Sequence, residues 1–155
     1  MLARTPSTFA VFASGAGSNF EALAVASREP GFPGAIALLV SDEPGAPALD
    51  RARRLGVPTL VLSGGRYRTR IEDERRWVEA IASRGVDAVL LAGFMRRLHD
   101  GVLGAFPDRI LNVHPSLLPA FPGRDAIRRA WDHGVRATGV TVHVVNGEVD
   151  AGPIV

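Results

Sequence analysis

The sequence predicts an α/β domain built around one open, mostly parallel sheet with helices on both faces. Short apolar runs of strand length alternate with longer amphipathic stretches along the chain, which is typical of parallel strands joined by helical crossovers. The run at 35–40 is apolar at every position, as expected of a strand that is covered on both faces. We therefore expect a single domain over residues 1–155.

The first half of the chain predicts three strands and two helices. Residues 18–27 place Phe20, Leu23 and Ala24 on one helical face. The expected elements are a strand at 8–13, a helix at 18–27, a strand at 35–40, a helix at 46–55, a turn and strand at 56–62, and a loop at 64–67.

The second half continues this alternation and completes a Rossmann-like sheet. The longest helix candidate, 70–84, precedes Gly85, which is suited to end it. Alternating β-branched residues at 137–145 predict a sixth strand. The other expected elements are strands at 86–92 and 109–113 and helices at 98–105 and 125–132, the last ended by His133 and Gly134.

Composition excludes several kinds of site. The chain has no cysteine, which excludes disulfides, thiolate nucleophiles and cysteine-ligated zinc. All 18 basic residues are arginine, so a Schiff-base lysine and a P-loop lysine are excluded as well. Arginine also explains a pI of about 10.3 at a net charge of only +2, so the pI does not indicate nucleic-acid binding. The absence of cysteine leads us to expect a cytoplasmic protein, and the absence of an apolar run of bilayer length leads us to expect no membrane contact.

Ligands of such sheets bind beyond the carboxyl ends of the strands, and the first of these positions holds a glycine-rich turn. Gly15 and Gly17 allow close approach of the backbone, and Ser18 and Asn19 add donors where a helix is expected to begin. Free amides there favour an anion such as a phosphate. The dinucleotide fingerprint is absent because Phe20 stands at its third glycine. The alternative is an ordinary turn whose Ser or Asn caps the helix.

The segments after the fourth and fifth expected strands offer other chemistry. Phe94 and Met95 are expected either to form the wall of a flat apolar pocket or to pack in the core. Asn112 and His114 are two residues apart in a strand, so their side chains share one face, and Pro115 keeps His114 out of a helix. An amide and an imidazole aimed together can bind the oxygen that becomes negative in acyl transfer. The alternative is a buried structural histidine.

Asp150 lies in a loop between Gly147 and Gly152, where its carboxylate can orient an imidazole. The remaining histidines are interpreted as structural, because they lie at a polar helix start, at a helix end and within an alternating strand: His99, His133 and His143. The four histidines show no metal-ligand spacing, so we expect no metal site.

Taken together, these motifs resemble the folate-dependent formyltransferase family over essentially the whole chain. The N-x-H-P-S-L-L-P element at 112–119 and the D-x-G-P element at 150–153 are specific to that family. The serine- and asparagine-containing glycine turn at 14–19 resembles the branch that formylates glycinamide ribonucleotide in purine biosynthesis. The segments at 91–98 and 139–143 add to the similarity.

The resemblance implies a reaction in which the amine of glycinamide ribonucleotide attacks the formyl carbon of 10-formyltetrahydrofolate, with no metal. Asn112 would bind the formyl oxygen, His114 would stabilise the oxyanion and pass a proton, and Asp150 would orient His114 and relay the proton. The substrate phosphate would be bound by Gly17, Ser18 and Asn19. The folate would be held by Arg70, Leu91, Phe94, Met95, Arg96, Arg97, Leu98, Asn112, Val145 and Asp150, with backbone groups of Arg96 and Leu98 on the pteridine and Arg70 near the carboxylate tail.

The sequence departs from the family pattern at two positions. Asp125 stands where the family usually has a histidine that supports the site. The family also continues for some tens of residues past the position of Val155, so we expect a domain that is incomplete at its C-terminal end.

Three alternatives stay open. A formyltetrahydrofolate hydrolase or a methionyl-tRNA formyltransferase would keep Asn112, His114 and Asp150 but usually carries a further domain. A non-catalytic phosphate- or nucleotide-binding module would use only the turn at 14–19. We expect small-molecule substrates, no nucleic acid, and a monomer or homodimer.

Overall fold

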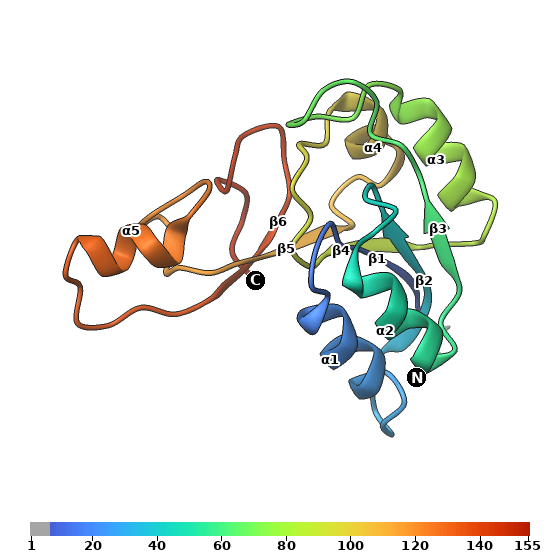
Figure 1. The fold of residues 1–155 in the computed structure, drawn as a ribbon, viewed down its shortest axis with the longest axis horizontal. Coiled ribbons are helices and arrows are strands. Elements are labelled where there is room, and N and C mark those ends of the chain that lie inside the picture. The colour runs from blue at the N-terminus through green and yellow to red at the C-terminus, as the bar shows by residue number, and fades with distance from the viewer. Residues whose placement is uncertain (1–6) are drawn as a thin grey trace, which may run out of the picture.

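A six-stranded sheet forms the centre of the structure, a computed structural model that describes residues 7–155 (Figure 1). The strand order is β3-β2-β1-β4-β5-β6. The first five strands run parallel, and β6 pairs with β5 in the antiparallel sense. The predicted fold class is therefore confirmed. The strands are β1 (Ser7–Phe12), β2 (Gly34–Ser41), β3 (Thr59–Val61), β4 (Ala88–Leu91), β5 (Ile110–His114) and β6 (Thr141–Val144).

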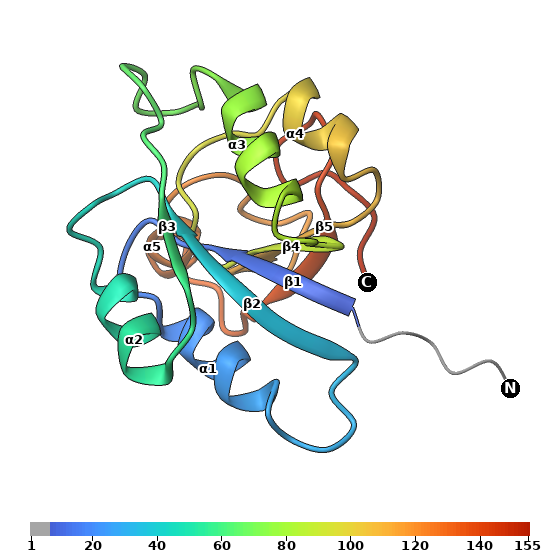
Figure 2. The ribbon, with the colours of Figure 1, turned by 90° about the vertical axis from the view of Figure 1, so that its right-hand side faces the viewer.

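Helices cover the two faces of this sheet in pairs (Figure 2). α1 (Ser18–Ala26) and α2 (Pro47–Leu55) lie on one face, while α3 (Glu74–Ala82) and α4 (Asp100–Ala105) lie on the other. Within the described residues, no helix is both long and apolar enough to cross a membrane.

Each pair of helices packs on its own hydrophobic cluster, and β1 contributes to both. Ala10 and Phe12 belong to the cluster under α3 and α4, whereas Val11 belongs to the cluster under α1 and α2. Successive side chains of a strand point to opposite faces, so a strand covered on both faces is apolar at consecutive positions. This burial explains the continuous apolar runs of the sequence.

Two elements are shorter than predicted. α3 begins at Glu74 rather than at residue 70, because the preceding segment is extended: Arg70 forms a bridge with Arg97, whose amide donates to the Thr69 carbonyl at 2.8 Å. β6 covers only Thr141–Val144 rather than 137–145, since its pairing with β5 is confined to four residues. The other predicted elements agree with the structure to within about three residues at each end.

α5 (Ala126–Asp132) lies apart from both helix pairs, in an arm that projects from the end of β5 (Figure 1). It ends at His133 with Gly134 in the left-handed region at φ 73°, as predicted. The strand order reverses between β1 and β4, so the carboxyl ends of these two strands flank the topological switch point. Ligands of open α/β sheets bind at this position.

Candidate functional site

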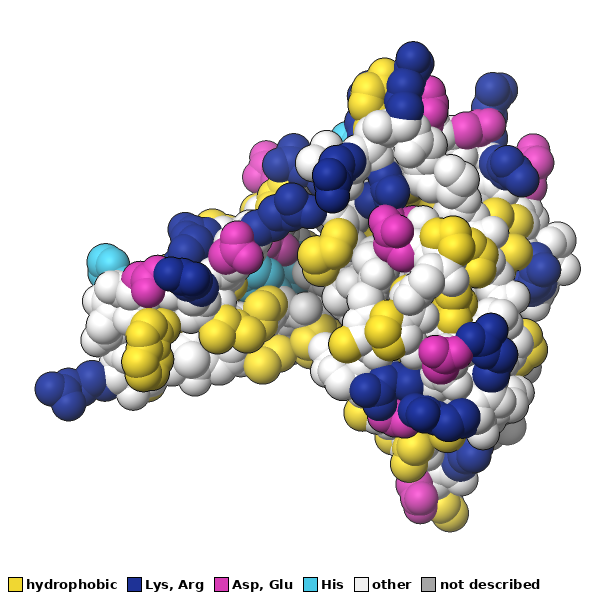
Figure 3. Space-filling view, viewed as in Figure 1, with side chains coloured by type: hydrophobic (Ala, Val, Ile, Leu, Met, Phe, Trp, Pro, Cys, Tyr) yellow, Lys and Arg dark blue, Asp and Glu magenta, His cyan; other side chains and the backbone are white. Residues whose placement is uncertain are grey.

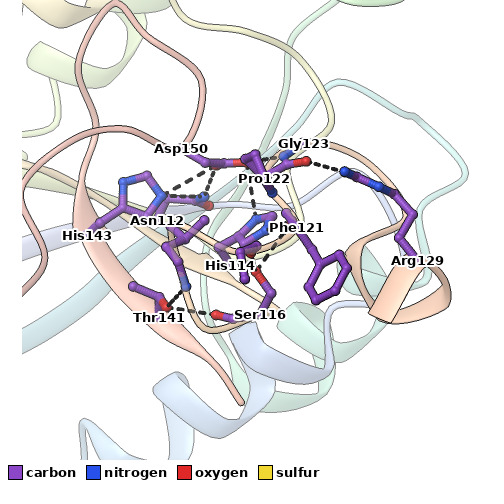
Figure 4. Close-up of polar contacts among 12 residues, drawn as sticks. Asn112, His114, Ser116, Phe121, Pro122, Gly123, Arg129, Thr141, His143 and Asp150 are labelled. Atoms are coloured by element: carbon purple, nitrogen blue, oxygen red, sulfur yellow. Dashed lines mark hydrogen bonds and ion pairs between the residues drawn. The ribbon is translucent and has the colours of Figure 1, made fainter. Parts of the chain in front are cut away.

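The end of β5 brings together the amide, imidazole and carboxylate that the sequence predicted (Figure 4). Asn112 Nδ2 lies 3.5 Å from Asp150 Oδ1, and His114 Nδ1 lies 3.3 Å from Asp150 Oδ2. Asp150 reaches this position from the loop after β6, with its backbone in the left-handed region at φ 53°. The amide of Gly123 donates to its Oδ2 at 2.7 Å and fixes the carboxylate.

Both ring nitrogens of His114 contact polar atoms of the protein. Nε2 lies 2.9 Å from the Phe121 carbonyl, which can only accept, so Nε2 carries a hydrogen. A hydrogen bond between Nδ1 and Asp150 then requires one further proton on either of these two atoms. His114 is buried and does not line the cavity described below.

His143 is a further member of the site, and its interpretation as a purely structural residue was incomplete. β6 pairs it with Asn112 across the antiparallel ladder. Its Nε2 lies 3.1 Å from Asn112 Nδ2 and 3.5 Å from Asp150 Oδ1. Its Nδ1 lies 3.1 Å from the Val144 carbonyl, so Nδ1 carries the hydrogen and Nε2 accepts from the Asn112 amide.

The loop after β5 forms a frame around these groups. Ser116 Oγ donates to the Ala120 carbonyl at 2.6 Å. Thr141 Oγ1 donates to the Ser116 carbonyl at 2.7 Å and accepts from the Leu118 amide at 3.0 Å. The peptide bond between Leu118 and Pro119 is cis. β6 therefore anchors the loop that carries the His114 partner.

A cavity of about 570 Å³ opens beside this cluster. All ten residues that the resemblance implies around a folate line it, and they come from the ends of β4 and β5 and from segments after β3, β4 and β6. Asn112, Asp150 and His143 also line this cavity, so the polar cluster faces it. The other lining residues are Thr69, His99, Gly123, Arg124, Asn146, Gly147, Glu148 and Val149.

Phe94 and Met95 take different positions on this wall. Phe94 packs on the core cluster, with its ring centroid 5.3 Å from that of Phe12 and 5.6 Å from that of Trp77, and also lines the cavity. Met95 is 52% exposed and lines the cavity. Phe94 therefore both packs in the core and forms part of the pocket wall. Met95 forms part of the pocket wall.

The glycine-rich turn after β1 adjoins the same wall. Gly17 is the N-cap of α1 in the left-handed region at φ 74°, and no side chain caps the helix, so the alternative in which Ser or Asn caps the helix is wrong. Ser18 and Asn19 are exposed at the first helical positions. The Met95 amide donates to Ser14 Oγ at 3.0 Å, and the Ser14 amide donates to the Gly93 carbonyl at 3.1 Å.

Two further expectations concern Asp125 and metals. Asp125 is the N-cap residue of α5 at φ 56°, is exposed, and does not line the cavity. Over residues 7–155, no three histidine, aspartate or glutamate side chains are grouped so that they could hold a metal ion.

Comparisons with known proteins identify the family of this chain. The family model described as "Formyl transferase" matches residues 7–155. The chain is 42% identical to phosphoribosylglycinamide formyltransferase of Bacillus subtilis over 147 residues, which is 95% of this chain and 75% of that protein. It is 40% identical to the human trifunctional purine biosynthetic protein adenosine-3 over 146 residues, which is 94% of this chain but only 14% of that protein.

Solved structures show the same similarity in three dimensions. Glycinamide ribonucleotide transformylase 1 from Symbiobacterium toebii matches with a TM-score of 0.90 at 46% identity, over 96% of this chain and 70% of that chain. Glycinamide ribonucleotide transformylase 1 from Geobacillus kaustophilus also matches with a TM-score of 0.90, at 44% identity, over 97% of this chain and 80% of that chain. The matched region thus contains nearly all of the described sheet and site.

Proposed function

The chain belongs to the formyl transferase family, and on that premise we propose that it transfers a formyl group from 10-formyltetrahydrofolate to the amine of glycinamide ribonucleotide. The observation that supports this function is the convergence of Asn112, Asp150 and His143 on one cavity, with His114 behind Asp150. The cavity also collects every residue expected around the folate.

The reaction begins when the amine nitrogen attacks the formyl carbon and the carbonyl electron pair moves onto oxygen. Asn112 Nδ2 has two hydrogens, and His143 Nε2 accepts one of them. The other is directed at Asp150 Oδ1 across 3.5 Å; this distance is at the limit of a hydrogen bond, so the hydrogen can be donated to the formyl oxygen instead when the substrate is bound. A single donor to such an oxyanion contributes about 2.7–4 kcal/mol of transition-state stabilisation.

The tetrahedral intermediate collapses when the bond from carbon to the folate nitrogen breaks and its electron pair stays on that nitrogen. The attacking amine loses one proton and the leaving nitrogen gains one, so a carrier is needed between them. Asp150 lines the cavity and its Oδ2 lies 3.3 Å from His114 Nδ1, so we assign the role of carrier to this pair. Because His114 is buried behind the carboxylate, the geometry supports a role through Asp150 more than direct contact with the oxyanion.

Binding of the two substrates divides between the two sides of the switch point. The uncapped N-terminus of α1, with Gly17, Ser18 and Asn19, suits the phosphate of glycinamide ribonucleotide. The cavity suits the folate, with the pteridine against 91–98 and the carboxylate tail near Arg70.

The test is folate release from 10-formyltetrahydrofolate measured with and without glycinamide ribonucleotide. Amine-dependent release supports the proposal, whereas amine-independent release identifies a hydrolase. Asn112→Ala and Asp150→Ala are expected to reduce kcat by about 100-fold or more, and His114→Ala should also abolish most turnover. Circular dichroism melting shows whether each variant is folded, and wild-type turnover in a folded Asn112→Ala protein would refute the assignment.

A further inference from the structure

The guanidinium of Arg96 makes a set of buried contacts that the roles above do not use. Its Nε donates to Asp42 Oδ2 at 2.5 Å, and only 9% and 3% of the two side chains are exposed. Asp42 follows β2 directly and Arg96 follows β4, whereas β1 lies between these strands in the sheet. The ion pair therefore joins the carboxyl ends of two strands that are not neighbours.

The same guanidinium holds the loop at 64–70. Nη1 donates to the Tyr67 carbonyl and, at 3.4 Å, to the Arg70 carbonyl. Gly64 lies directly against it, because a Cβ built at that position would be 2.2 Å from Arg96 Cζ. The loop thus fits around the planar fork of an arginine, and any larger residue at position 64 would displace it.

This loop is part of the cavity wall. Thr69 and Arg70 line the cavity, as do the residues of 95–98. The Arg97 amide donates to the Thr69 carbonyl at 2.8 Å, and the Glu72 amide donates to the Gly64 carbonyl at 3.0 Å. The side chain of Arg96 and the backbone of Arg97 together hold this loop against the segment at 95–98, and both segments line the cavity.

Asp42 supplies the negative charge that keeps the guanidinium in place. Its Oδ1 is buried and has no hydrogen-bond partner among residues 7–155, so within this part of the chain its charge is balanced by Arg96. Glu43 Oε1 is 3.9 Å from Arg96 Nη2 but its side chain is 56% exposed. Asp42 does not line the cavity, so an effect of Asp42 on a ligand has to pass through Arg96.

We propose that Asp42 and Arg96 are positioning residues whose buried ion pair holds the loop at 64–70 against the cavity wall and thereby sets the affinity for the folate. This inference rests on the proposed function. The pair takes no part in formyl or proton transfer, so it acts on the dissociation constant and KM for the folate and leaves kcat unchanged.

Arg96→Lys tests the inference without leaving Asp42 as an unpaired buried charge. Lysine keeps the positive charge but cannot reach a carboxylate and two carbonyls with one planar fork. We expect the Kd for tetrahydrofolate, measured by calorimetry, and the KM for 10-formyltetrahydrofolate to rise about tenfold, with kcat at saturation unchanged. Adding Asp42→Asn to Arg96→Lys should raise Kd little further, since Asp42 acts through Arg96.

The matched control is Asp50→Asn, which removes a carboxylate from the exposed pair between Asp50 and Arg53 on α2 and should leave Kd and KM unchanged. Hydrogen exchange tests the loop without a ligand: the Glu72 and Arg97 amides should exchange faster in Arg96→Lys, while the Ala92 amide, bonded to the Phe12 carbonyl at 2.9 Å, should not change.

The outcomes separate this inference from the proposed function. Unchanged Kd and unchanged exchange in a folded Arg96→Lys protein would overturn the positioning role, and so would a fall in kcat at constant KM. If wild-type protein binds no tetrahydrofolate, the proposed function fails; unaltered exchange at Glu72 and Arg97 would then overturn the loop contact as well, and faster exchange would support it.

Discussion

Asn112 is held between two acceptors that come from different parts of the chain. His143 Nε2 lies on the neighbouring strand and Asp150 Oδ1 on the loop that follows it. Because both atoms accept, they fix the orientation of the amide, with its nitrogen toward them. The contact with Asp150 is long at 3.5 Å, so its hydrogen can turn to the formyl oxygen with little reorganisation as charge develops there.

His143→Ala should therefore reduce turnover even though His143 is not assigned to proton transfer. Without Nε2 the Asn112 amide loses an acceptor, and we expect kcat to fall about tenfold with a smaller change in KM for the folate. His143→Gln, whose amide oxygen can accept in place of Nε2, should restore part of the lost rate. Steady-state kinetics of the two variants measure this difference.

The control for this pair is His133→Ala, because His133 is exposed at the end of α5 and lies outside the cavity. It should keep the wild-type kcat. If His143→Ala retained wild-type kcat as well, the orienting role would be wrong.

The position of His143 also shows what a sequence can reveal at this scale. Asn112 and His114 were predicted together because residues two apart in one strand share a face. Contact between Asn112 and His143 depends on the register of an antiparallel pair across 31 residues, and periodicity within each strand does not set that register. The pairing of β5 with β6 would have been the signal.

Among the elements, the turn between β1 and α1 depends on one of its two glycines far more than on the other. A Cβ at Gly17 would lie 2.5 Å from Ala48 Cβ and 2.7 Å from Ala48 Cα at the start of α2, and φ is 74°. A Cβ at Gly15 would meet no atom within 4 Å, and its φ is not in the left-handed range. The two positions therefore form a matched pair for substitution.

Gly17→Ala should lower the free energy of unfolding by about 2–4 kcal/mol, from left-handed backbone strain together with the clash against α2. Gly15→Ala should change it by less than about 1 kcal/mol. Urea denaturation measures both. Gly17→Ala should also raise the KM for glycinamide ribonucleotide, because the first turn of α1 is displaced. Equal stability of the two variants would contradict this account.

The predicted boundaries of helices and strands are correct where the local sequence determines them. They are wrong where contacts with residues distant in the sequence determine them. Gly134 ends α5 by its own conformation. The helical pattern at 70–73 is overridden by pairing with Arg97 and by the fit of the Arg96 guanidinium against Gly64. Ile71 is buried in the core in either case, so its apolar character alone does not reveal whether the segment is helical.

At the scale of the whole molecule, arginine and acidic side chains are interspersed over the face shown in Figure 3. The charged residues that line the cavity are Arg70, Arg96, Arg97 and Arg124 together with Glu148 and Asp150. Because the net charge of the chain is only +2, the attraction of the cavity arginines for an anionic ligand is local. Salt should screen this attraction over a Debye length of about 10 Å.

Arg70→Met should raise the KM for 10-formyltetrahydrofolate about three- to tenfold and reduce its dependence on salt, because a cation near the carboxylate tail is lost. The affinity for a pteroate analogue that lacks the glutamate tail should not change. Arg66→Met is the control: Arg66 also stacks on Tyr67, at 5.2 Å against 4.0 Å for Arg70, but does not line the cavity. If Arg70→Met weakened the binding of 10-formyltetrahydrofolate and of the pteroate analogue equally, Arg70 would not lie near the glutamate tail.

A hydrogen bond between Ser14 and Met95 links the two halves of the proposed site. One residue belongs to the turn proposed for the phosphate, the other to the wall proposed for the folate, and a single hydrogen bond of 3.0 Å joins them. If binding of one substrate changes the affinity for the other through this contact, the second substrate must change the affinity for the first by the same factor. Cooperativity between the two substrates is therefore reciprocal, and its size can be read from either binding isotherm.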